Sequence, residues 1–144
     1  MYHKILVPLD GSQHSKRALR EVIKLCQGQE KEYQITLIHV VPALTTELYQ
    51  FLQHNDINVD GVIKNQGEAV LASAAAELKE AGIKFVIDVK IGDPAQEICI
   101  QSKYENYDLI VMGSRGIGQF KELMLGSVSH KVLHNTDCPV LIVK

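Results

Sequence analysis

Three features that would place a chain in a special class are missing from these 144 residues: a block of like charges, a long apolar run and a paired cysteine motif. The 15 basic and 17 acidic residues are interspersed and sum to a net charge of -2, which leaves no basic footprint for nucleic acid. Apolar runs such as 109–112 and 140–143 fall far short of the roughly 20 residues that span a bilayer. We therefore expect no nucleic-acid partner and no membrane-spanning segment.

The cysteines and the first residues indicate the cellular compartment of the protein. The three cysteines, Cys26, Cys99 and Cys138, are odd in number and form no CxxC pair, which argues against a disulfide framework or a four-cysteine zinc site. We expect them to be buried free thiols. Residues 1–5 lead straight into a strand-like segment without the apolar stretch and cleavage site of a signal peptide, so we expect a cytoplasmic location.

What the chain does contain is typical of one folded domain. Apolar residues make up 46% and charged residues 22%, close to the averages of globular domains. No repeat, low-complexity stretch or linker divides residues 1–144, and the length suits a single core. We predict one domain.

Five apolar, β-branched runs predict strands, because helical patterns separate them. Their apolarity is largely continuous, which is typical of parallel strands covered on both faces. The fold class is therefore α/β, a doubly wound five-stranded parallel sheet with helices on both faces. The third run alternates more and is expected nearer an edge. The runs are 4–9, 35–41, 84–91, 108–112 and 140–143.

Capping residues predict where the helices begin and end. Ser12 is a candidate N-cap for the first helix, Asp93 followed by proline begins the third, and the fourth covers about 127–134. An alanine-rich second helix at about 66–81 should stop at Gly82. Between 42 and 65 only a short helix near 47–53 and a turn near 55–61 are suggested.

The candidate site is a glycine-rich segment after the fourth strand. Doubly wound sheets bind ligands at the carboxyl ends of strands, where the strand order reverses, so the loops after the first and fourth strands are expected to form the site. Gly113, Gly116 and Gly118 form one patch, and Gly126 to Ser129 form a second at the start of a helix. Glycine lets a backbone approach a ligand closely, and free amides at a helix start attract phosphate. Hydroxyls of Ser127 and Ser129 and the guanidinium of Arg115 could add donors.

Two other phosphate loops do not fit. Gly113 and Gly118 have P-loop spacing, but Gln119 and Phe120 stand where Lys and Ser or Thr are required. Gly116 and Gly118 open a dinucleotide fingerprint, but Lys121 takes its third glycine position and the loop does not follow the first strand.

A family resemblance covers nearly the whole chain. The spacing Gly113-x2-Gly116-x9-Gly126-Ser127 matches the ATP-binding pattern of the universal stress protein family, and residues 4–12, 92–94 and 138–143 resemble other parts of that family. The resemblance implies a Rossmann-like fold of the adenine nucleotide alpha hydrolase type and ATP bound with Mg or Mn. It also implies a homodimer through Val140 to Val143; the other protein partners are unknown.

The resemblance also implies roles for residues. Pro8, Leu9 and Asp10 would line the adenosine side, with Val40 against the base, and Asp10 would face the ribose or a metal; alternatively, Asp10 is a turn residue before Ser12. The phosphates would meet a longer set: Met112, Gly113, Ser114, Arg115, Gly116, Ile117, Gly118, Gln119, Gly126, Ser127, Val128 and Ser129.

The histidines are weaker candidates for a functional site. His130 and His134 share a helix face and could in principle bind zinc, but no HExxH pattern supports a zinc site, so we interpret them as solvated. His39 is expected to be a hydrogen-bonded core residue that could border the adenine. No candidate base supports hydrolysis, so a nucleotide-dependent regulatory module is the leading hypothesis; a slow ATPase or nucleotidyl transferase and a nucleotide-free dimeric scaffold remain open.

Overall fold

A five-stranded parallel sheet forms the centre of the molecule in a computed structural model that describes residues 2–116 and 125–144. The strand order is β3-β2-β1-β4-β5, so the order reverses between β1 and β4. This confirms the predicted fold class and places the third and fifth strands at the two edges. The strands are β1 (Lys4–Pro8), β2 (Gln34–Val41), β3 (Phe85–Ile91), β4 (Leu109–Gly113) and β5 (Val140–Val143).

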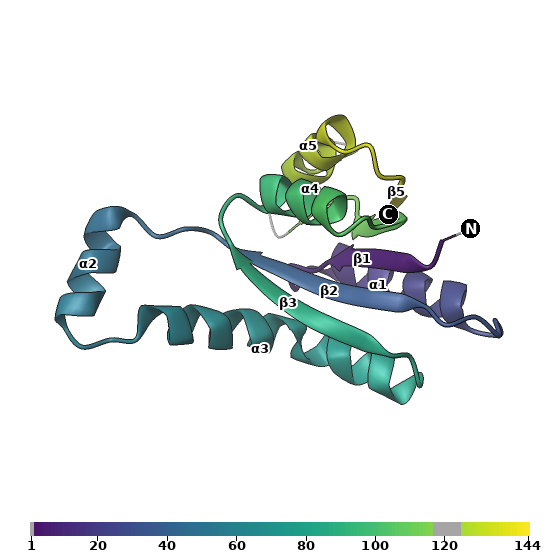
Figure 1. The fold of residues 1–144 in the computed structure, drawn as a ribbon, viewed down its shortest axis with the longest axis horizontal. Coiled ribbons are helices and arrows are strands. Elements are labelled where there is room, and N and C mark those ends of the chain that lie inside the picture. The colour runs from purple at the N-terminus through teal and green to yellow at the C-terminus, as the bar shows by residue number, and fades with distance from the viewer. Residues whose placement is uncertain (1, 117–124) are drawn as a thin grey trace.

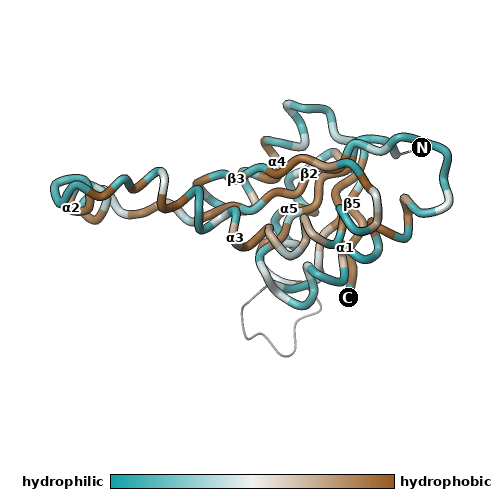
Figure 2. Tube along the Cα trace, turned by 90° about the horizontal axis from the view of Figure 1, so that it is seen from below, coloured by the Kyte–Doolittle hydropathy of each residue, from teal (hydrophilic) through white to brown (hydrophobic). Residues whose placement is uncertain are grey.

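Two pairs of helices cover the sheet (Figure 1). Helices α1 (Gln13–Cys26) and α3 (Val59–Glu80) lie on one face, and α4 (Pro94–Tyr104) and α5 (Ser127–Asn135) lie on the other. Each face has its own buried cluster, one around Val7 and Leu37 and one around Leu6 and Ile110. Alternate residues of the same central strands thus feed both cores, which explains their continuous apolar runs. Figure 2 shows hydrophobic residues gathered along these strands.

Helix ends follow the predicted capping chemistry. The Ser12 hydroxyl accepts a hydrogen bond from the Ser15 amide at 3.2 Å and begins α1. The Asp93 carboxylate accepts one from the Gln96 amide at 2.9 Å and begins α4. Gly82 takes a φ of +70° just after α3, a conformation that favours glycine.

The segment between β2 and β3 departs from the prediction. Helix α2 (Thr46–His54) agrees with the short helix expected there, but α3 begins at Val59, seven residues before the expected start at 66. The predicted turn is confirmed around 55–58 and wrong for 59–61, because the Asn58 side chain accepts a hydrogen bond from the Gly61 amide at 3.1 Å and caps a helix. Helix α2 and the start of α3 extend away from the body as an arm (Figures 1 and 2).

The cysteines are free and only half-buried, so the expectation of free thiols holds but that of full burial does not. Burial raises the pKa of the thiols of Cys26, Cys99 and Cys138 above its ordinary value. Within residues 2–116 and 125–144, no helix is both long and apolar enough to cross a membrane.

Candidate functional site

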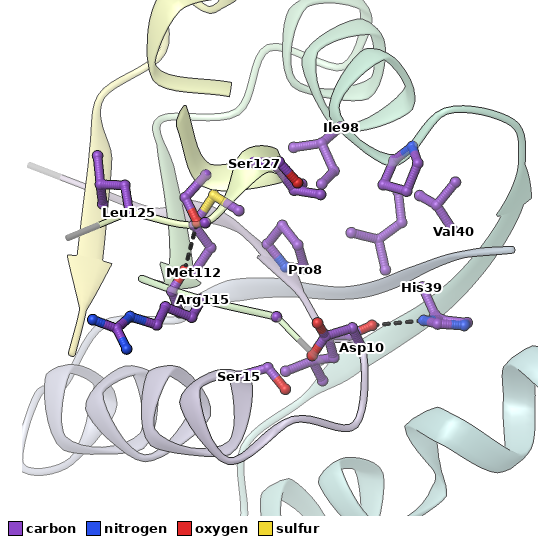
Figure 3. Close-up of a pocket in the computed structure, with 18 of the residues that line it drawn as sticks. Pro8, Asp10, Ser15, His39, Val40, Ile98, Met112, Arg115, Leu125 and Ser127 are labelled. Atoms are coloured by element: carbon purple, nitrogen blue, oxygen red, sulfur yellow. Dashed lines mark hydrogen bonds between the residues drawn. The ribbon is translucent and has the colours of Figure 1, made fainter. Parts of the chain in front are cut away.

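A cavity of about 330 Å³ opens at the carboxyl ends of β1, β2 and β4, where the strand order reverses (Figure 3). The first residues of α4 and α5 close its other side. Its volume lies at the lower end of the range of about 300–1,000 Å³ that is usual for small-molecule sites. It is lined by Pro8, Leu9, Asp10, Ser15, Ile38, His39, Val40, Pro42, Pro94, Ile98, Met112, Gly113, Arg115, Gly116, Leu125, Gly126, Ser127, Val128 and Ser129.

One part of the cavity is apolar. Ile38 and Val40 come from β2, Ile98 from α4 and Met112 from β4, and all four pack in the same buried cluster. Nearby, Nδ1 of His39 donates a hydrogen bond to the Leu9 carbonyl oxygen at 2.7 Å, and this bond holds the ring at the cavity wall (Figure 3). Flat apolar walls with a fixed polar ring at the border suit an aromatic base.

The other part carries the start of α5. Gly126 is the N-cap of this helix and, having no side chain, forms no side-chain cap. The first hydrogen bond at this helix end runs from the His130 amide to the Gly126 carbonyl at 3.0 Å. The amides of residues 127–129 therefore have no carbonyl of the helix to bond with, and they carry the positive end of the helix dipole. A bound anion could accept hydrogen bonds from them.

The carbonyl of Ser114 joins the two glycine patches. It accepts hydrogen bonds from the Gly126 amide at 2.6 Å and from the Ser129 hydroxyl at 3.1 Å. The Ser129 hydroxyl also reaches the Gly113 carbonyl at 3.0 Å. Together these bonds hold the β4 end of the loop against the first turn of α5.

Two serines of the predicted phosphate set use their hydroxyls inside the protein. The Ser114 hydroxyl shares a hydrogen bond with His14 Nδ1 at 3.3 Å, and Ser114 does not line the cavity. Ser129 lines the cavity, but its only hydroxyl hydrogen is directed at the two carbonyls of residues 113 and 114. Of these two hydroxyls, only that of Ser129 was expected to bond to phosphate, and in the structure it is bonded to the two carbonyls instead.

Asp10 has features of both roles that the sequence left open, a turn residue and a residue of the ligand site. Its Oδ1 accepts a hydrogen bond from the Ser12 amide at 2.9 Å, as a turn residue does. Its Oδ2 lies beside Gly116, so close that a Cβ on that glycine would be 2.6 Å away. Asp10 thus shapes the turn and also presents a carboxylate oxygen next to the glycine-rich loop.

The cavity brings together most of the predicted residues, with three kinds of exception. Ser114 is directed elsewhere, residues 117–119 lie outside the described residues, and several lining residues were not predicted. Arg115 lines the cavity, but its guanidinium points away from Asp10 (Figure 3). The unpredicted members, apart from His39, are Ser15, Ile38, Pro42, Pro94, Ile98 and Leu125. Their signal was available, because Ile38 and Pro42 belong to or follow β2 at the carboxyl edge and Pro94 begins a helix there.

The histidines of α5 form no metal centre with other side chains that the structure describes. The rings of His130 and His134 lie 4.4 Å apart on the exposed side of the helix. Across residues 2–116 and 125–144, no group of three His, Cys, Asp or Glu side chains is placed to hold a metal ion.

Comparisons with known proteins agree with this architecture. A sequence model of the universal stress protein family matches residues 1–144. Universal stress protein YxiE of Bacillus subtilis is 36% identical over the full length of both chains. The solved structure of MJ0577, a universal stress protein of Methanocaldococcus jannaschii, superposes with a TM-score of 0.84 at 29% identity, over 100% of this chain and 96% of that one.

A third similarity concerns the fold alone. A family member from Arabidopsis thaliana, solved with AMP bound, is 24% identical, with a TM-score of 0.69 over 99% of this chain and 91% of that one. The full-length family match and the similarity to YxiE lead to one conclusion: this chain belongs to the universal stress protein family.

Proposed function

We propose that this chain binds ATP in the cavity and that occupancy changes the surface it presents to partner proteins, as a nucleotide-dependent regulatory module. One observation carries the proposal: the uncapped first turn of α5 and the glycines Gly113 and Gly116 line one end of a cavity whose other end is apolar. A triphosphate and a purine require these two environments side by side. The Arabidopsis relative solved with AMP shows that this fold accommodates an adenine nucleotide.

The proposed orientation follows from the two ends. The base lies against Val40 and Ile98, close to the ring of His39. The phosphates accept hydrogen bonds from the amides of residues 127–129 and from the backbone near Gly116. Ser127 adds a hydroxyl, because its exposed side chain lines the cavity at the helix start.

A divalent cation belongs to this proposal because of Asp10. Its Oδ2 lies against Gly116, beside the proposed position of the phosphates. The negative carboxylate and a negative phosphate placed side by side repel each other. Mg²⁺ commonly binds through one or two carboxylates together with phosphate oxygens and water. Asp10 would hold Mg²⁺ or Mn²⁺ and so convert a repulsion into a bridge.

Self-association through β5 is a further part of the proposal. Among the strands of residues 2–116 and 125–144, β5 pairs only with β4 and so lies at an edge of the sheet, and Leu141 on it is 39% exposed. Open apolar edge strands favour pairing with another strand. A two-fold dimer that pairs β5 with its copy would cover this edge.

Titration calorimetry with ATP, AMP and adenosine tests the central proposal. We expect ATP to bind more tightly than adenosine, because adenosine has no phosphate to accept hydrogen bonds from the amides of α5. Equal affinities would remove the phosphate role, and no binding of any of the three would favour the nucleotide-free scaffold. Phosphate release faster than about 1 per second, in the usual range of enzymes, would favour an ATPase instead.

A further inference from the structure

Ser129 is a buried serine that lines the cavity, and its hydroxyl is bonded to two backbone carbonyls of the segment proposed to surround the phosphates. Only 2% of its surface is exposed. Its hydroxyl donates to the carbonyls of Gly113 and Ser114 at 3.0 and 3.1 Å. A serine hydroxyl has one hydrogen, so Ser129 cannot donate to a phosphate while these bonds last.

The carbonyls of Gly113 and Ser114 affect the electrostatics of the proposed phosphate site. A carbonyl oxygen carries partial negative charge, and the carbonyls of Gly113 and Ser114 belong to the segment proposed to surround the phosphates. The hydroxyl of Ser129 is bonded to both, and the amide of Gly126 adds a second donor to Ser114. These donors offset the negative charge of the carbonyls where an anion is to bind.

The same bonds also fix the position of residues 113 and 114 relative to the start of α5. Ser129 is in the first turn of α5, Gly113 is the last residue of β4, and Ser114 follows it. The Ser114 amide also donates to the Val143 carbonyl of β5 at 2.7 Å. The β4 end of the loop is thereby tied to α5 on one side and to the sheet on the other, so residues 113 and 114 keep a fixed position relative to the amides at the start of α5.

From this geometry we infer that Ser129 is a positioning residue for the phosphates of the ligand: its hydroxyl holds the Gly113 and Ser114 carbonyls and does not bind the ligand itself. This inference rests on the proposed ATP site. It differs from the general phosphate-binding role of the helix start, because it assigns the Ser129 amide and the Ser129 hydroxyl to different tasks.

The test compares ATP and adenosine affinities by calorimetry in Ser129→Ala, Ser129→Thr and Ser102→Ala. Loss of the Ser129 hydroxyl should weaken ATP binding about tenfold, as expected for one hydrogen bond near a charged group, and leave adenosine affinity unchanged. The threonine variant keeps a hydroxyl and should restore ATP affinity. Ser102→Ala is the matched control, since Ser102 is similarly buried at 3% exposure and donates its hydroxyl to the Cys99 carbonyl at 2.9 Å, but it does not line the cavity.

The outcomes separate the inference from the proposal on which it rests. If the wild-type protein binds ATP and Ser129→Ala loses ATP and adenosine affinity equally, or loses neither, the positioning role is wrong and the ATP site stands. Failure of the threonine variant to restore affinity while its thermal midpoint matches the wild type also overturns it. If the wild-type protein does not bind ATP at all, both fail together.

Discussion

Gly116→Ala should weaken ATP binding roughly tenfold or more while leaving the fold intact, because of a single close approach. A Cβ at this position would lie 2.6 Å from Asp10 Oδ2, nearer than real Cβ contacts come, so the carboxylate must move. Asp10 is also held through Oδ1 by the Ser12 amide at 2.9 Å, so it cannot rotate away without breaking that bond. The added methyl group and the displaced carboxylate both intrude where the phosphates are proposed to bind.

The magnitude follows from what the ligand loses. Disturbing one or two hydrogen bonds to a charged group costs about 1.5–3 kcal/mol, which is a loss of affinity of roughly tenfold or more. Protein stability should fall by about 1 kcal/mol at most, the net worth of the Asp10–Ser12 hydrogen bond, since Gly116 itself is exposed and its φ is not in the left-handed region. Calorimetry with Mg-ATP and urea unfolding measure the two quantities.

Gly61→Ala is the matched control for this variant. There a Cβ would lie 2.7 Å from the Asn58 side chain, again the end of a polar group, but on α3 and away from the cavity. ATP affinity should stay at the wild-type value in the control. Wild-type affinity in Gly116→Ala as well would refute the assignment of ATP to this cavity.

Three more predictions follow from the same structure. Asp10→Asn should raise ATP affinity in EDTA, because a repulsive charge is gone, and should shrink the gain that Mg²⁺ gives; an undiminished Mg²⁺ effect would mean that Asp10 is not a metal ligand. Leu141→Lys should turn a dimer into a 16 kDa monomer in sedimentation at micromolar concentration, since charge on an edge strand opposes pairing; a wild-type protein that is already monomeric would contradict the dimer. Backbone amides of Lys4 and His3 bond to Asp108 Oδ2 at 2.8 and 2.9 Å and lower the pKa of Asp108, so its contribution to stability should be present above about pH 4 and be lost as the pH falls through the lowered pKa. In Asp108→Asn the urea unfolding midpoint should vary less with pH in that range, and a pH dependence equal to that of the wild type would count against this role of Asp108.

Sequence patterns predicted the sheet well because its strands are buried on both faces. The continuous apolar runs of β1, β2 and β4 have few other interpretations, and the more alternating β3 was correctly expected near an edge. The start of α3 was missed for a physical reason. Asn58 and Gly61 are typical of turns, and the side-chain bond that closes an Asn turn also caps a helix, so only the three-dimensional contacts distinguish the two.

Glycine spacing located the candidate site, but the sequence could not assign side-chain directions within it. Ser114 and Ser129 were both predicted to face phosphate, and both direct their hydroxyls into the protein. Which way a hydroxyl points depends on acceptors such as His14 that are distant along the chain. The apolar wall was missed in part, since Ile98 resembles an ordinary core residue until α4 is placed across the strand ends.

A crystal structure of the protein with millimolar Mg-ATP tests the central claim most directly. The account predicts phosphate oxygens within hydrogen-bonding distance of the amides of residues 127–129, with the base against Val40. A cavity that stays empty, or that the protein fills with its own side chains, would contradict it.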